Sequence, residues 1–316
     1  MVDRIQFPGA PALAGRPPSP AILLLQCLWR ERAVRAGAII VGFVLLAALS
    51  APAVGHLLQH GPMEQFQDTA LDDMGLPVGP TFEFPLGADG NGRDVLVRTL
   101  YGARVSLIVG IPATTIAMIL GTAVGLVSGF FAGRTDRVIS QGIDVALSFP
   151  FVVTALSLLS LNRGGTGLPI VPPVVVVILV IAMFSWAYFA RLTRGLVLEL
   201  RTSPMVEASR IIGASWARII WLDILPNILP TVFVYWAVQL PANIVAEATL
   251  SFLGVGIQAP MPSWGNMIAE AQRTSLYQDQ PWFLVGPGLA LFLTVVGFNT
   301  LSAGLRNVLD PHRRRI

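Results

Sequence analysis

Residues 203–226 read SPMVEASRIIGASWARIIWLDILP and lie between two long apolar segments. Ser203 suits an N-cap, and Pro204 suits the first helical position, where its missing N–H costs nothing. Gly213 can end the resulting helix in a left-handed turn. One face of this helix is then apolar and consists of Met205, Ala208, Ile211 and Ile212.

A second short helix is predicted from Ala214 towards Leu225, where Pro226 would stop it. Its apolar side consists of Trp216, Ile219 and Ile220. We therefore expect a helix–turn–helix that connects two membrane spans and presents an apolar side to another protein. An ordinary amphipathic connector between spans is the alternative.

The composition is that of a polytopic membrane protein. Hydrophobic residues make up 54% of the 316 positions and charged residues 12%, and the mean hydropathy is +0.68. All 21 basic residues are arginine, so the chain cannot build a P-loop or a Schiff-base site, both of which need a lysine. If transport by this chain is driven by ATP, another subunit must bind the ATP. The single Cys27 permits no intrachain disulfide, and the arginines need no nucleic-acid partner to explain them.

Six apolar stretches predict six membrane spans in an all-α fold. The spans are expected at residues 36–58, 105–132, 138–161, 168–190, 228–257 and 282–305. Around them we expect a disordered tail (1–22), an amphipathic lead-in (23–35), an extracytoplasmic segment (59–104) and a basic tail (312–316). Residues 105–311 would form the core. Residues 51–53 (APA) resemble the cleavage site of a signal peptide. The apolar run of this segment is longer than that of a typical signal peptide, so we expect an uncleaved first span.

The distribution of arginine predicts the orientation. With the N-terminus in the cytoplasm, sixteen of the 21 arginines lie on the cytoplasmic side. The five outside are Arg93, Arg98, Arg104, Arg163 and Arg273. Both termini and residues 203–226 are therefore expected in the cytoplasm, in a multi-pass protein of the inner (plasma) membrane.

Two stretches near the first span invite a metal-site interpretation. Residues 89–94 (DGNGRD) resemble a calcium loop, but Arg93 and Asp94 stand where that loop needs an oxygen ligand and a glycine, which favours a simple turn. His56 and His60 have helical spacing, but two imidazoles alone make a poor metal site. We expect no metal at either place.

A polar stripe marks the fifth span. It consists of Tyr235, Gln239, Asn243 and Glu247, which recur every four residues on one broad helical face. A carboxylate within a span normally faces a bundle interior or a water-filled cavity. The stripe is therefore predicted to line a translocation pathway, and polar contact between helices is the alternative. Pro241 in the same span suggests a kink.

The opening stretch resembles the EAA loop of ABC importer permeases. The resemblance rests on Glu207-Ala208-Ser209, then Gly213, then residues 224–226 (ILP). Ser209 replaces an alanine of the pattern, and Asp223 occupies the usual isoleucine position. The resemblance implies a cytoplasmic coupling helix that docks into a groove of the ATPase subunit. The expected coupling residues are Glu207, Ala208, Ser209, Ile211, Ile212, Gly213 and Trp216.

Further blocks widen the resemblance to residues 30–311, and together they resemble the C-type permease subunit of dipeptide/oligopeptide importers. The blocks are residues 84–87 (FPLG), 92–96 (GRDVL), 101–107 (YGARVSL), 247–254 (EATLSFLG), 262–266 (PSWGN), 287–290 (PGLA), 304–306 (GLR) and 309–311 (LDP).

That resemblance implies the type I ABC importer permease architecture and a chain that is not itself an enzyme. It also implies a second, B-type permease, two ATPase subunits that hold ATP and magnesium, and an extracytoplasmic binding protein that delivers the peptide. No cofactor is expected in this chain. Relatives that carry nickel, glutathione or haem leave those substrates open. An ion-coupled secondary transporter is the alternative class, with Asp144 and Glu247 as its acidic candidates.

Overall fold

The computed structural model describes residues 28–162, 170–273, 278 and 280–309. The predicted tails at 1–22 and 312–316, and residues 23–27 of the predicted lead-in at 23–35, lie outside these residues. The described residues are helical apart from turns and two isolated β-bridges, Leu71 with Pro77 and Ala88 with Asp94. The expectation of an all-α fold is confirmed.

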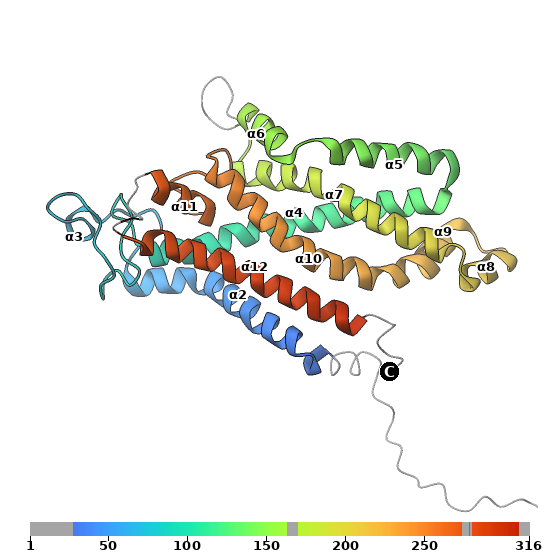
Figure 1. Cartoon of the computed structure of the whole chain (residues 1–316), viewed down its shortest axis with the longest axis horizontal. Helices are drawn as coiled ribbons and strands as arrows, with labels where there is room; N and C mark the ends of the chain where they lie inside the picture. Colours follow the sequence, from blue (N-terminus) through green and yellow to red (C-terminus); the bar gives the residue numbers. More distant parts are fainter. Residues whose placement is uncertain (1–27, 163–169, 274–277, 279, 310–316) are drawn as a thin grey trace, which may run out of the picture.

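Long helices form one elongated bundle (Figure 1). Four of them are α2 (Arg32–Leu58), α4 (Val95–Phe131), α7 (Pro173–Leu200) and α12 (Trp282–Leu309), and a fifth, α10 (Leu225–Phe252), continues from a short helix before it. Helix α2 packs along α12, while α4 packs against α7 and α10. All five rods are long and apolar enough to cross a membrane, and the number of candidate spans is six if one bent pair of helices counts as a single span.

The bent pair corrects the third predicted span. Instead of one helix over 138–161, the chain forms α5 (Gly133–Ser148) and α6 (Phe151–Leu161), bent by 81° relative to each other. Pro150 has no backbone N–H to donate and disfavours helical geometry at the residue before it. Phe149 is accordingly extended, with φ −72° and ψ 129°. Pro150 thus separates two helices, whereas the predicted span of residues 138–161 would have contained it within one continuous helix.

Helix α4 begins ten residues before the predicted start of the second span. Asp94 causes this early start, because its side-chain Oδ1 accepts a hydrogen bond from the backbone N–H of Val97 at 3.0 Å. With 37 residues, α4 is roughly 55 Å long at the usual rise per residue. Its outer turns therefore project beyond the apolar part of the bundle. Helix α7 likewise differs from its prediction, because it begins at Pro173 and runs ten residues past Ala190.

Three glycines let α4 and α7 approach closely. A Cβ atom built at Gly121, Gly125 or Gly129 would lie 2.3 to 2.7 Å from atoms of α7. Contact at that distance excludes any larger side chain, as in the close helix pairs of membrane proteins. This pair forms the centre of the bundle.

The helix before α10 also differs from the prediction. It begins at Trp216 as α9 (Trp216–Arg218), passes through a π-helical turn, η1 (Ile219–Ile224), and runs directly into α10. Pro226 therefore does not stop it, because in the π-helical turn Leu225 donates to the carbonyl of Ile220 and the proline occupies the first turn of α10. The connection from the turn at residues 212–215 to the fifth span is one continuous rod of helix.

Shorter elements cap the two ends of the bundle. At one end lies α8 (Pro204–Ile211); at the other lie α3 (Gln67–Ala70) and α11 (Trp264–Arg273). We call residues 59–94, which join α2 to α4, the outer segment. Ala70, Phe84 and Ala88 are buried together in it and give it a small core of its own.

Candidate functional site

Helix α8 ends in the left-handed turn that the sequence predicts. Gly213 has a φ of 79°, and its N–H donates to the carbonyl of Arg210 at 3.0 Å. The N–H of Ala214 donates to the carbonyl of Ser209, also at 3.0 Å. These two bonds form a Schellman motif, which requires a residue that tolerates positive φ. The motif fixes the direction in which the chain leaves α8.

The apolar face of α8 points away from the protein. Ile211 is 82% exposed and Ile212 is 78% exposed, and Trp216 at the start of α9 is more than half exposed. Glu207, Ala208 and Gly213 are exposed as well, whereas Ser209 is half-buried. An exposed cluster of large apolar side chains is typical of a surface that binds another protein. The structure brings all seven predicted coupling residues into this one end of the molecule.

The opposite face of α8 is anchored in the bundle. Val206 is fully buried in a cluster that includes Val197 of α7, Leu126 of α4 and Ile220 of η1. Because α8 packs on η1 and Val206 lies in one buried cluster with side chains of α4, α7 and η1, a force on α8 reaches the ends of the spans through this cluster.

A cavity of about 190 Å³ lies at the bend between α5 and α6. Gln239 and Asn243 of α10 line it, together with Tyr188 of α7 and the aromatic rings of Phe149 and Phe151. The remaining lining residues are Ala146, Leu147, Ile181, Phe184, Ser185, Ala242 and Ala246. The lining thus has amide and hydroxyl groups and aromatic walls, and it contains no charged side chain.

The predicted polar stripe divides between this cavity and the interior. Asn243 is held in place by two neighbours: Ser185 Oγ donates to its Oδ1, and its Nδ2 donates to Thr114 Oγ1, both at 2.8 Å. Gln239 is half-buried, so part of its amide reaches the cavity. Tyr235 lies outside the cavity lining, with its ring edge-to-face against Phe189.

Glu247 is buried inside the helix bundle and does not line the cavity. Its carboxylate is fully buried and accepts hydrogen bonds from Ser106 Oγ at 2.9 Å and Ser251 Oγ at 2.7 Å. It therefore links α4 to α10, which is the interhelical contact that the sequence left open as the alternative. The pathway role expected for the stripe stays a prediction. Of the four stripe residues, Gln239 and Asn243 line the cavity.

Ion pairs hold α5 against α7. Arg194 donates to both carboxylate oxygens of Asp136, from Nε and from Nη2, and Ser128 and Ser140 donate to Oδ1 of the same carboxylate. Arg191 pairs with Asp144 at 2.6 Å, with both side chains largely exposed. Asp144, the candidate ion-coupling residue of the alternative class, is thus engaged by an arginine.

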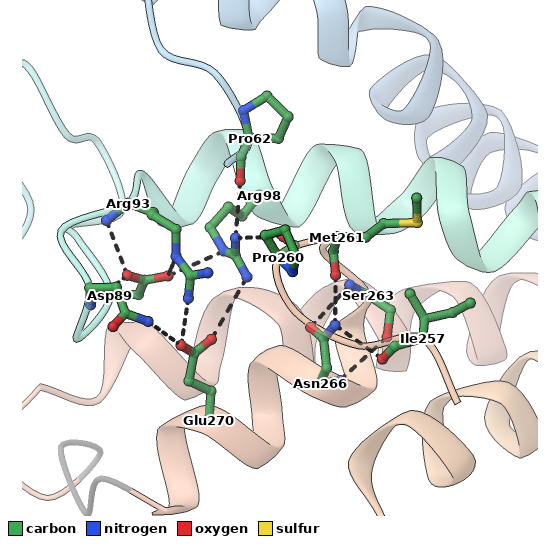
Figure 2. A network of polar contacts seen from close by, with 11 residues as sticks. Pro62, Asp89, Arg93, Arg98, Ile257, Pro260, Met261, Ser263, Asn266 and Glu270 are labelled. Atoms are coloured by element: carbon green, nitrogen blue, oxygen red, sulfur yellow. Dashed lines mark hydrogen bonds and ion pairs between the residues drawn. The ribbon is translucent and has the colours of Figure 1, made fainter. Parts of the chain in front are cut away.

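At the outer end, two arginines and two carboxylates form an ion network that was not predicted from the sequence (Figure 2). Asp89 accepts from Arg93 Nε at 2.7 Å and lies 3.2 Å from Arg98 Nε. Glu270 of α11 pairs with the same two arginines. Arg98 also donates to the carbonyl oxygens of Pro62 and Pro260. Arg93, Arg98 and Asp89 are almost completely buried, so the network ties the outer segment to α4 and α11.

The electrostatics of this network are those of desolvated charges. Burial raises the pKa of Glu270, and the negative charge of Asp89 acts in the same direction, while Arg93 and Arg98 oppose the shift. Asp89, Arg93 and Arg98 are close in the sequence, but their partner Glu270 follows Arg93 by 177 positions, so sequence spacing does not reveal the whole network. The signal available was the presence of two arginines on the side where arginine is rare.

In both stretches with a metal-site interpretation, side chains form hydrogen bonds to other protein groups. Residues 89–94 form the predicted turn, in which Asp89 Oδ1 accepts from the N–H groups of Asn91 and Arg93. His60 hydrogen-bonds through Nδ1 to Asp94 at 2.7 Å and stacks on Phe84 with ring centroids 4.8 Å apart. Within the described residues, no group of three or more His, Cys, Asp or Glu side chains could hold a metal ion.

Comparison with known sequences identifies related proteins. The profile of the family described as "Binding-protein-dependent transport system inner membrane component" matches residues 121–315. A glutathione transport system permease of Pectobacterium atrosepticum is 35% identical over 90% of this chain and 89% of that protein. A dipeptide transport system permease of Bacillus subtilis is 35% identical over 94% and 88%. An oligopeptide transport system permease of Haemophilus influenzae is 34% identical over 90% and 86%.

Solved structures share the fold. One crystal form of the MetNI methionine ABC transporter in an inward-facing conformation matches with a TM-score of 0.54 and 19% identity, over 68% of this chain and 97% of that one. A second crystal form matches with a TM-score of 0.51 and 20% identity, over 66% and 95%. This likeness confirms the expected permease architecture.

Proposed function

This chain belongs to the family of binding-protein-dependent transport system inner membrane components, and on that premise we propose that it carries peptides across the inner membrane as one half of an ATP-driven passage. The chain is a membrane permease rather than an enzyme. A second, B-type permease forms the other half of the passage. Two ATPase subunits supply the energy, and an extracytoplasmic binding protein delivers the substrate.

The observation that carries this proposal is the exposed face of α8. Ile211, Ile212 and Trp216 present apolar area to solvent at the end of a helix that Val206 anchors in the bundle. Apolar side chains held outward on a fixed element are suited to fill a groove on a partner. Since the chain contains no lysine and so no P-loop, ATP and its magnesium ion belong to that partner.

The substrate class follows from the relatives and from the cavity. The related permeases carry the names of glutathione, dipeptide and oligopeptide transport systems, and all three substrates contain peptide bonds. Around Gln239 the cavity offers an amide and aromatic walls without charge. Such a lining can hydrogen-bond to a peptide backbone while it accepts side chains of either sign. The second permease completes the passage, because this cavity of about 190 Å³ is too small for an oligopeptide.

Purification of the intact complex tests this proposal. We expect two ATPase subunits and a second permease to co-purify with the chain, and peptide uptake by vesicles to continue when an uncoupler removes the ion gradient. The isolated chain should neither bind nor hydrolyse ATP. Uptake that stops with the uncoupler while ATP is present would contradict the proposal and favour an ion-coupled transporter.

A further inference from the structure

The outer segment carries an exposed surface that contributes no residue to the cavity. It lies at the end of the bundle opposite α8, where α3 marks it in Figure 1. Two short loops of it are exposed at every residue, 72–76 and 80–83. We call these two loops the outer tips.

The outer tips hold large apolar side chains in solvent. Met74 is 82% exposed, and Phe82 is fully exposed. Both loops are nevertheless ordered by hydrogen bonds: Asp72 Oδ1 accepts from the N–H groups of Met74 and Leu76, and Thr81 Oγ1 accepts from the N–H of Phe84. An ordered loop that keeps a phenylalanine out of its own core is arranged for contact with another molecule.

The charge around the tips is of one sign. The outer segment exposes five carboxylates, Glu64, Asp68, Asp72, Asp73 and Glu83, and no arginine or lysine precedes Arg93 in it. Anionic lipid headgroups would be repelled by this surface, and so would a second copy of it. The fitting partner is a protein whose contact face has basic residues around an apolar patch.

The tips are also firmly connected to the transport core. Phe84, which follows Phe82 by two residues, is buried in the small core of the outer segment and stacks with His60. From there Arg93 and Asp89 tie the segment to Glu270 of α11, and α11 packs on α10. A partner bound at the tips would therefore pull on the outer end of the helix that lines the cavity.

We propose that the outer tips are the surface on which the extracytoplasmic binding protein docks, through a basic-rimmed apolar patch of its own. This inference rests on the proposed function, because it places the tips outside the membrane and takes a binding protein as partner. Phe82 and Met74 fill the patch, and the five carboxylates steer the partner and set its orientation.

The test uses the whole importer in lipid nanodiscs with its purified binding protein added. The measurement is the binding-protein concentration that half-maximally stimulates ATP hydrolysis. The double variant Met74→Ser with Phe82→Ser should raise this concentration at least about tenfold, because both side chains lose their buried contacts. Basal hydrolysis should not change, since both side chains are exposed. The matched control is Ile170→Ser, an equally exposed apolar residue between α6 and α7, which should leave the concentration unchanged.

Two further arms make the result specific. In the wild-type importer the half-maximal concentration should rise with salt, and a variant with Asp72→Asn, Asp73→Asn and Glu83→Gln should show a weaker salt dependence. In a Cys27→Ser background, Phe82→Cys carrying a photoreactive maleimide should cross-link to the binding protein, whereas Ile170→Cys should not. An unchanged half-maximal concentration in the Met74/Phe82 variant, in a wild-type importer that does respond, would overturn the docking surface alone. A wild-type importer that does not respond at all would contradict the proposed function, and this inference with it.

Discussion

At the scale of single residues, the polar groups of α10 have two different environments. Gln239 borders the cavity, while Glu247, two turns further along, is sealed between α4 and α10 by two serine hydroxyls. The spacing of four residues predicted a common face, and steps of four on a helix do drift slowly around it. Which neighbour each residue meets depends on the packing of α4 and α7, and sequence periodicity contains no information on that packing.

This difference predicts a difference in chemical accessibility. In a Cys27→Ser background, Gln239→Cys should react with a small polar thiol reagent in the purified complex, and its rate should change when ATP is added. Glu247→Cys should stay protected in every nucleotide state, because this position is fully buried and is not among the residues that line the cavity. Mass spectrometry of the labelled chain gives both rates. Equal labelling of the two positions would place the passage along the whole stripe.

At the scale of elements, the helices themselves were largely predictable. Apolar length predicted the spans, and Ser203, Pro204 and Gly213 predicted both ends of α8. The errors lie where local backbone chemistry overrides apolar length: Pro150 breaks the third span, while Pro226 is absorbed by a π-helical turn. The outer ion network could not be predicted, because it joins charges within residues 89–98 to Glu270, which follows Arg93 by 177 positions.

That network predicts a large effect of one arginine. Arg98→Met should lower the stability of the complex by about 3–5 kcal/mol, because it leaves the buried Asp89 and the half-buried Glu270 with only Arg93 to balance them. Thermal unfolding of the purified complex, followed by intrinsic fluorescence, measures the change. Adding Glu270→Gln to Arg98→Met should restore part of the loss, since it removes the unbalanced charge.

The exposed arginine of the other ion pair is the matched control for Arg98. Arg191→Met breaks the contact with Asp144, and both of those side chains are largely exposed. An exposed pair contributes up to about 1 kcal/mol, so this variant should hardly move the unfolding temperature. Equal effects of Arg98→Met and Arg191→Met would contradict a structural role for the buried network.

At the scale of the whole molecule, the two ends of the bundle expose different surfaces. Helix α8 at one end exposes apolar area, and the acidic outer tips lie at the other. Between them, continuous helices connect the ends: η1 and α10 form one rod from α9 to the residues near α11. Under the proposed function, a movement that ATP binding in the partner imposes on α8 would reach the cavity and the outer end through these helices.

The most direct test of this account measures how much of the ATPase subunits co-purifies with this chain when exposed apolar residues of α8 and its C-terminal turn are replaced by charged ones. The variant carries Ile211→Asp with Ile212→Asp; both side chains are exposed, so the chain itself should insert and fold normally. The matched control is Thr202→Asp, an exposed polar position two residues before α8. We predict that the double variant, purified from membranes, retains about one-tenth or less of the ATPase subunits that the control retains, and supports no peptide uptake. Full retention of the ATPase with normal uptake would contradict the account.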